Sequence, residues 1–164
     1  MVEKSKRATT KRTTRKKAAY SVASGRSVSR KATATKPEHI DNSEVHLLQG
    51  KGSKRKGGDK RGYYWHIYAN DTRAGFVFIN WIDEEPFGEH ASIQIKINTK
   101  FQNRGIGRVA YRLACDKSSY DTIFAHMRKS NLASKKAAEA AGFQAVTSSE
   151  ISQLVMVWNR PAAE

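Results

Sequence analysis

The hydrophobic positions of this chain repeat at two spacings, one typical of strands and one of helices. Isoleucines occupy every second position of residues 93–97, which is the period of a strand with one buried face. Residues 106–113 carry apolar side chains at i, i+3, i+4 and i+7, which is one face of a helix. By these criteria we expect strands at residues 45–48, 63–68, 74–82, 90–97, 122–127 and 153–158, and helices at residues 104–117 and 133–141.

The order of these elements predicts one compact α/β unit. A chain of 164 residues has room for one hydrophobic core and not comfortably for two. We expect turns at residues 69–72 and 83–88, where turn-forming residues separate the predicted strands. Residues 50–62 contain only Gly, Lys, Arg, Ser and Asp, so we expect a flexible basic loop there.

A glycine-rich turn joins the strand at 90–97 to the following helix. The N-terminus of a helix presents unpaired N–H groups and the positive end of its dipole, which favours an anion. Glycines lack Cβ, so a phosphate can approach the backbone closely. No Lys-Ser/Thr pair closes the turn as in a P-loop, and the third glycine of the dinucleotide fingerprint is absent. An ordinary strand–helix turn is the alternative. The residues of this candidate cradle are Gln102, Asn103, Arg104, Gly105, Ile106, Gly107 and Arg108.

A second segment, residues 131–143, follows another predicted strand. It consists largely of helix formers and ends in Gly142-Phe143, where the glycine favours a helix stop. Together the two segments resemble the GNAT superfamily of acyl-CoA-dependent N-acetyltransferases over roughly residues 62–160. The family carries Gln/Arg-x-x-Gly-x-Gly/Ala after its fourth strand, and Asn followed eleven residues later by Gly-Phe. The matching residues here are Gln102, Gly105 and Gly107, then Asn131, Gly142 and Phe143.

The resemblance implies a fold and a donor site. It implies a mixed central sheet with splayed fourth and fifth strands and flanking helices, with acetyl-CoA as co-substrate. The chain between the first two strands is too short for the family's first helices, so these would be reduced or absent. The pantetheine arm would pair with the strand backbone near Ile95 and Ile97. Asn131 matches a position that contacts the cofactor arm, although Asn also suits a helix N-cap.

Basic side chains near the two motifs are candidates for the remaining phosphate charge. They are equally compatible with ordinary cations on a helix surface. The residues are Arg104, Arg108, Lys135 and Lys136.

The catalytic groups are less clearly marked. Many relatives carry a tyrosine as general acid four residues before the Gly-Phe pair, and this position is Ala138 here. The leaving thiolate would then take its proton from another side chain or from a bound water, or there would be no general acid at all. Ser130 and Ser134 lie nearby in the sequence. For the base we select Glu89 and His90, because relatives often deprotonate the amine from this region, and because histidine titrates near neutrality. A solvated side chain is the alternative for both. His126 is a further candidate, and a packed histidine is its alternative.

Charge is concentrated in two segments. The net charge is +15, of which residues 1–36 carry +11 and residues 51–61 carry +5, so the remainder carries −1. Few large apolar residues occur in residues 1–40, so we expect a disordered basic tail before a folded domain at residues 41–164. Such segments bind nucleic acid or another polyanion through counterion release. A solvated tail and a targeting segment are the alternatives. The candidate contacts are Lys11, Arg12, Arg15, Lys16, Lys17, Lys54, Arg55 and Lys56.

Cysteine usage and hydropathy bear on the compartment. Cys115 is the single cysteine, which excludes an intramolecular disulfide and a multi-cysteine metal site, and we expect it to be a packed thiol. No apolar run approaches the length of a membrane span, and the N-terminus lacks the apolar stretch of a signal peptide. We therefore expect an intracellular protein without a bound metal.

The hypothesis from sequence is N-acetyl transfer from acetyl-CoA to an amine on a macromolecule associated with nucleic acid. The basic loop would flank the acceptor entrance and would repel a small polyamine. A catalytically silent GNAT-like module that binds nucleic acid is the alternative, which Ala138 favours. An acyl-CoA sensor that binds the donor without transfer is a third reading.

Overall fold

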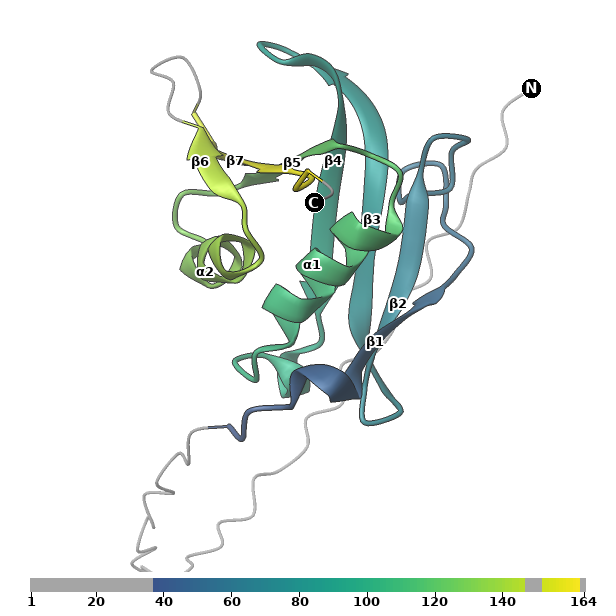
Figure 1. Ribbon diagram of the computed structural model, residues 1–164, viewed down its shortest axis with the longest axis vertical. Coiled ribbons are helices and arrows are strands. Elements are labelled where there is room, and N and C mark those ends of the chain that lie inside the picture. Colours follow the sequence, from purple (N-terminus) through teal and green to yellow (C-terminus); the bar gives the residue numbers. More distant parts are fainter. Residues whose placement is uncertain (1–36, 147–151, 163–164) are drawn as a thin grey trace, which may run out of the picture. The chain divides into compact units, whose positions relative to one another are not determined.

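The computed structural model describes residues 37–146 and 152–162. The elements follow one another as expected for an α/β unit, with two α-helices inserted after the fourth and fifth strands (Figure 1). They are η1 (Asn42–Glu44), β1 (Val45–Gln49), β2 (Tyr63–Ala69), β3 (Thr72–Glu84), β4 (Gly88–Ile97), η2 (Thr99–Phe101), α1 (Ile106–Lys117), β5 (Thr122–Met127), α2 (Leu132–Ala140), β6 (Gln144–Val146) and β7 (Leu154–Asn159).

The strands form one mixed sheet in the order β1-β2-β3-β4-β5-β7-β6. Neighbouring strands are antiparallel except β4 and β5, which are parallel. The β2–β3 hairpin turns through Asn70 and Asp71, whose φ angles are +48° and +57°. Both residue types tolerate the left-handed region, which a two-residue hairpin turn requires. The predicted turn at 69–72 is therefore confirmed.

One face of the sheet carries the hydrophobic core. Alternate residues of β2 to β5 and β7 point to this face, where they meet the apolar sides of α1 and α2. Ile93 and Ile79 of adjacent strands are almost fully buried there, as is Ala110 of α1. Figure 1 shows α1 in front of β4 and beside β3, and α2 beside the β5, β7 and β6 part of the sheet. Neither described α-helix is both long and apolar enough to cross a membrane.

The opposite face of the sheet is covered by neither α1 nor α2. Residues 50–62 contain no helix, so the prediction of missing first helices is confirmed. The loop is less free than the sequence suggests. Asn80 of β3 accepts a hydrogen bond from the Gly57 N–H at 2.7 Å and donates one to the Arg55 carbonyl at 2.9 Å. Because Asn80 alternates with the core residues of β3, it ties the loop to the uncovered face.

Most element boundaries differ from the expectation by one or two residues, and one strand is new. The predicted helix at 104–117 begins at Ile106, because Gly105 adopts a left-handed conformation. Strand β3 extends to Glu84, since its long hairpin with β4 continues past the predicted end. Strand β6 was not predicted, because its three residues are too few to show a period of two.

Candidate functional site

Strand β4 has an open backbone edge over half of its length. Its pairing with β5 is confined to Ala91 with Ile123 and Ser92 with Phe124. Beyond Ser92, residues 93–97 pair with β3 alone. Figure 1 shows β5 and β7 turning away from β4 at this level. The predicted splay of the fourth and fifth strands is confirmed. Ile95 and Ile97 lie on the segment of β4 that has no strand partner on the β5 side.

The open edge of β4 leads to the N-terminus of α1, which lacks a side-chain cap. Gly105 is the N-cap residue, with φ +84°, and it offers no side-chain acceptor. The N–H groups of Ile106, Gly107 and Arg108 belong to the first helical turn, so no carbonyl of the helix can accept from them. Helix α2 is different, because the Asn131 side chain accepts from the Ser134 N–H at 3.2 Å. The N-cap interpretation of Asn131 is thus confirmed.

Two arginines beside this helix end have donors without partners. The Nε atoms of Arg104 and Arg108 are buried, and neither has a hydrogen-bond acceptor among the described residues. A terminal nitrogen of Arg108 contacts Nε2 of His39 at 3.0 Å and donates to Oδ1 of Asn42 at 3.1 Å. One end of this guanidinium therefore holds the chain that precedes β1, and its Nε donor remains unmatched.

Neighbouring side chains explain why both positions of the turn are glycines. A Cβ at Gly105 would overlap the imidazole of His39. A Cβ at Gly107 would lie 3.2 Å from the Cβ of Ala137, so this glycine permits close packing of α1 on α2. At both positions a neighbouring side chain lies close to where a Cβ would be, and the role of the two glycines in phosphate approach stays a prediction.

The remaining residues predicted to bind the donor lie on the β4–α1 connection and on α2. The side chain of Gln102 donates to the carbonyl of Ile97 at 3.1 Å, which closes the connection from β4. Asn103 is exposed with φ +61°. Lys135 forms an exposed i,i+4 ion pair with Glu139 at 3.7 Å, and Lys136 is also exposed on α2.

This arrangement fits a bound phosphate or pyrophosphate. It combines three unpaired backbone donors, the positive end of a helix of twelve residues and two unmatched guanidinium N–H groups. Ordinary helix ends are satisfied by a side-chain cap or water. Here the neighbouring donors would leave buried polar groups unsatisfied unless an anion or water accepted from them.

A histidine pair occupies the uncovered face near the point where β4 and β5 meet. His90 of β4 is 5% exposed, and its Nδ1 lies 2.7 Å from the Gly88 carbonyl oxygen. Its Nε2 lies 3.0 Å from Nε2 of His126 on β5. The two rings stack with their centroids 5.1 Å apart. The structure thus brings one predicted base together with the further candidate His126.

Glu89, the other predicted base, lies elsewhere. Consecutive strand residues point to opposite faces, so Glu89 and His90 cannot line one site. The Glu89 carboxylate is exposed and pairs with Arg61 at 3.8 Å, while the Arg61 guanidinium also covers Trp81. We therefore find Glu89 beside the basic loop and separate from the histidine pair.

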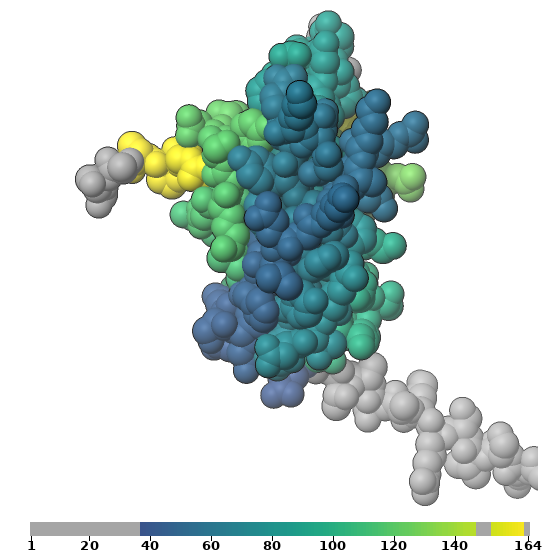
Figure 2. All heavy atoms as spheres, turned by 90° about the vertical axis from the view of Figure 1, so that its right-hand side faces the viewer, coloured from purple at the N-terminus to yellow at the C-terminus, as the bar shows by residue number. Residues whose placement is uncertain are grey.

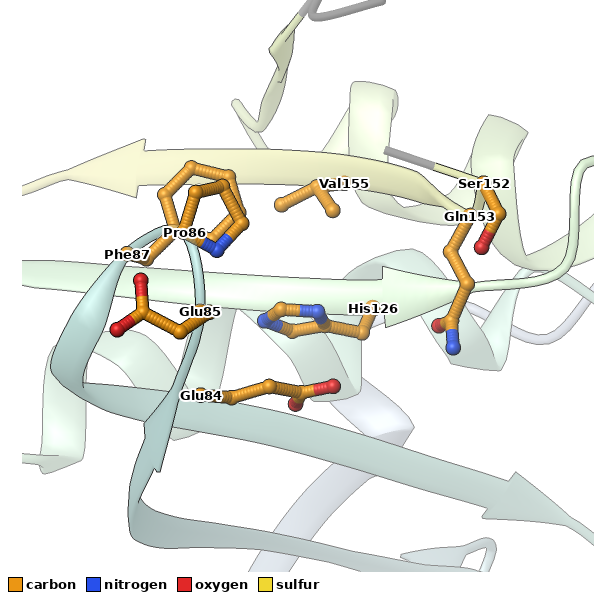
Figure 3. A pocket seen from close by; sticks show the side chains of 8 residues that line it. All are labelled: Glu84, Glu85, Pro86, Phe87, His126, Ser152, Gln153 and Val155. Atoms are coloured by element: carbon orange, nitrogen blue, oxygen red, sulfur yellow. The ribbon is translucent and has the colours of Figure 1, made fainter. Parts of the chain in front are cut away.

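A cavity of about 120 Å³ adjoins His126. The imidazole of His126 projects into it between the β3–β4 hairpin, with Glu84 and Glu85, and Val155 of β7 (Figure 3). Burial lowers the pKa of His126, the neighbouring His90 lowers it further, and Glu84 opposes both effects. His126 is therefore neutral at pH 7, in a form that can accept a proton.

The position of the family's general acid is filled by a small core residue. Ala138 is fully buried, so no hydroxyl projects from this position. Tyr111 of α1 is also buried, and burial is the main cause that raises its pKa. Ser134 is half-buried and Ser130 is exposed. Nothing in this geometry distinguishes one of these hydroxyls as the acid.

The basic residues expected to contact a polyanion fall in two groups. Lys54, Arg55 and Lys56 are exposed on the loop tied to Asn80, and the Lys56 ammonium lies 5.3 Å from the Phe76 ring centre. The view toward the β1–β2 side shows this part of the chain, in blue, standing out from the surface (Figure 2). The tail residues Lys11, Arg12, Arg15, Lys16 and Lys17 lie outside the described residues.

Cys115 is a packed thiol, as predicted. It is fully buried, and burial raises its pKa to about 12. The thiolate needed for nucleophilic chemistry is therefore not accessible at neutral pH.

Sequence reasoning missed two functional features. It did not pair His126 with His90, because 35 residues separate them and only the meeting of β4 with β5 joins the two. It also missed Asn80, which stands between apolar residues in the middle of β3; this polar residue was the available signal.

The comparisons with known proteins agree with this geometry. The family model described as the acetyltransferase (GNAT) domain matches residues 12–144. The search of curated proteins finds no match.

Solved structures similar to this chain include acetyltransferases. The microcin C7 self-immunity acetyltransferase MccE, crystallised with acetyl-CoA and AMP, is 20% identical, with a TM-score of 0.50 and coverage of 62% of each chain. RimL, a ribosomal L7/L12 alpha-N-protein acetyltransferase in complex with coenzyme A, is 18% identical, with a TM-score of 0.50 and coverage of 60% of this chain and 62% of that chain. A GNAT family acetyltransferase from Streptococcus agalactiae is 11% identical, with a TM-score of 0.53 and coverage of 60% and 66%.

At these identities the structural likeness establishes the fold, and the aligned part spans less than two thirds of each of these three chains. The family model, in contrast, covers well over half of the present sequence. The chain belongs to the GNAT acetyltransferase family.

Proposed function

We propose that this protein is an N-acetyltransferase that moves an acetyl group from acetyl-CoA to an amine. The observation that carries the proposal is the continuity between the open edge of β4 and the uncapped N-terminus of α1. A donor whose amide-bearing pantetheine arm is joined to a pyrophosphate can use both features, the strand edge for the arm and the helix N-terminus for the charge.

The chain's own residues have separate tasks in donor binding. The N–H groups of Ile106, Gly107 and Arg108 would donate to the pyrophosphate, with Arg104 and Arg108 supplying positive charge. The backbone of residues 93–97 would orient the arm so that the thioester lies near Ser92. Acetyl-CoA supplies the activated acetyl group. MccE was crystallised with acetyl-CoA and RimL with coenzyme A, which supports this choice of donor.

The acceptor that we propose is an amine on a macromolecule associated with nucleic acid, inside the cell. Two features support this choice. Neither α1 nor α2 lies on this sheet face and residues 50–62 form no helix there, so the described residues leave room for a large partner. The same residues form a basic loop that is fixed by Asn80 on that face, where it can contact phosphates. The relative RimL is named for a ribosomal protein as its acceptor.

Radiolabelled acetyl-CoA tests the proposal with the full chain and defined acceptors. We expect label to appear in basic proteins bound to nucleic acid, at a rate that falls as salt rises, because salt weakens the basic contacts. Transfer to no acceptor by a protein that binds the donor would favour the second candidate.

The second candidate is a catalytically silent GNAT-like module that binds nucleic acid. The buried Ala138, at the position where relatives place an acid, is the observation that favours it. The two candidates predict the same polyanion binding and differ in acetyl transfer.

A further inference from the structure

The sequence pointed to His90 and His126 as candidate bases, and the structure adds a cavity beside His126. It lies on the face opposite α1 and α2, and the histidine pair connects it with the meeting point of β4 and β5. Its walls differ in chemistry. Val155 is buried and apolar, whereas Glu84 and Glu85 are exposed and have no ion-pair partner among the described residues.

The hydrogen bonds of the pair determine which nitrogen is free. A carbonyl oxygen only accepts, so the contact of 2.7 Å with Gly88 requires a proton on Nδ1 of His90. Where Nδ1 carries the only proton of the His90 ring, its Nε2 accepts from the Nε2–H of His126 across 3.0 Å. Neutral His126 therefore has its lone pair on Nδ1. Each step follows from the donor and acceptor capacity of imidazole and the carbonyl.

We propose that this cavity is the acceptor-amine site, where Glu84 and Glu85 attract a cationic polypeptide amine and His126, positioned by His90, removes its proton. The inference rests on the proposed function and deepens it, because it names the class of acceptor and a base.

The reaction balances with these groups. The ammonium of the acceptor gives one proton to Nδ1 of His126 and becomes a neutral amine. Its lone pair forms the C–N bond to the acetyl carbonyl, the C–S bond breaks, and the electron pair leaves on sulfur. The second proton lost from nitrogen passes to the thiolate, and His126 releases its proton to solvent. The net products are an amide, free coenzyme A and one proton.

The neighbours of His126 suit this task. Phe87, Phe124 and Val155 provide an apolar surface, His90 fixes the ring, and Glu84 stabilises the imidazolium that forms. The protein's charge is divided between two surfaces. The basic loop suits the phosphates of nucleic acid, while the acidic hairpin suits the basic protein bound to it. A cationic polypeptide is favoured over a small polyamine because neither α1 nor α2 lies over the cavity, so among the described residues no helix blocks its approach.

The first test is nitrogen-15 NMR of the imidazoles in the full chain. We expect His126 to carry its proton on Nε2, His90 to carry its proton on Nδ1, and the pKa of His126 to lie below the ordinary value of 6.5. Loss of the Glu84 charge in Glu84→Gln removes the effect that raises this pKa, so it should fall further. A proton on Nδ1 of neutral His126 would overturn the proposal.

The second test measures acetyl transfer to a short lysine-rich peptide, a glutamate-rich counterpart with the same number of amines, and spermidine. We expect the lysine-rich peptide to be preferred, and Glu84→Gln with Glu85→Gln to raise its KM.

His126→Gln should lower kcat/KM by about 10²- to 10⁴-fold, the usual contribution of a general base. His46→Gln, a change of an exposed histidine on β1, is the matched control and should leave kcat/KM unaltered. Preference for the glutamate-rich peptide or spermidine, or transfer to none of the three by a protein that binds acetyl-CoA, would overturn the proposal.

His90 is a positioning residue, so its variant needs a different readout. His90→Asn should lower kcat and shift the acid limb of the pH profile. KM should stay unchanged, because the acceptor keeps its contacts with the carboxylates of Glu84 and Glu85. A change in KM alone would contradict the positioning role. Failure of the proposed function is recognised separately, because acetyl-CoA would then not bind. The NMR experiment needs no donor and reports on the histidine pair alone.

Discussion

Replacement of Gly105 by alanine perturbs the candidate donor site at its most constrained residue. Gly105 has φ +84°, and an alanine there costs about 1–2 kcal/mol because its Cβ crowds the backbone in the left-handed region. The added Cβ also overlaps the His39 ring, which must move and release Arg108. Loss of that hydrogen bond adds about 1 kcal/mol. A domain of this size loses about 2–8 °C in Tm for each kcal/mol.

The effect on donor binding should exceed the effect on stability. Gly105 sets the direction of the first N–H groups of α1, so its replacement misaligns donors that the pyrophosphate would use. Loss of one charge-assisted hydrogen bond, about 1.5–3 kcal/mol, weakens binding by about 10- to 150-fold. Isothermal titration with acetyl-CoA measures this change directly, and thermal melting measures the accompanying loss of stability.

Gly88→Ala is the matched control for this experiment. Gly88 has φ +63°, and a Cβ there meets no atom within 4 Å. It carries a comparable backbone cost in the β3–β4 hairpin, away from the glycine turn. We expect both variants to melt earlier and only Gly105→Ala to lose affinity for acetyl-CoA. Equal affinity of the two variants would refute the assignment of the turn as a phosphate site.

Three further predictions concern stability, reactivity and polyanion binding. Asn131→Ala should cost about 0.5–2 kcal/mol of unfolding free energy, because the Ser134 N–H loses its cap, whereas Asn131→Ser should retain most of it; equal denaturation midpoints would contradict the cap. Cys115, with its pKa near 12, should not react with a thiol reagent at pH 8 until the protein is unfolded, and rapid labelling of the native protein would show that the thiol is accessible. Deletion of residues 1–36 should flatten the salt dependence of polyanion affinity while residues 51–61 retain a weaker interaction; an unchanged slope would exclude the tail as the binding arm.

The sequence predicted most of the fold because its strands and helices are periodic. Alternation along residues 93–97 and the helix pattern after Ile106 report local geometry that tertiary contacts then preserve. The boundary at Gly105 was misplaced because a helix can begin only after the left-handed residue, and φ is not visible in a pattern of apolar residues.

The site was partly predictable, because some of its interactions join residues close in the sequence and others join residues far apart. The glycine turn and Asn131 act within a few residues of sequence, so motif spacing found them. The His90–His126 pair and the packing of Gly107 on Ala137 depend on elements that meet only in the folded chain. The two predicted bases were treated as equivalent, although adjacent residues on a strand face opposite sides.

The measurement that tests the central claim most directly is calorimetric titration of acetyl-CoA into the full chain, with free coenzyme A and a coenzyme A fragment lacking the pyrophosphate as references. We expect acetyl-CoA and coenzyme A to bind, and we expect the fragment to bind far more weakly, because the N-terminus of α1 supplies the charge complementarity. Binding of the fragment as tight as that of coenzyme A, or no binding of acetyl-CoA to the folded protein, would contradict the account.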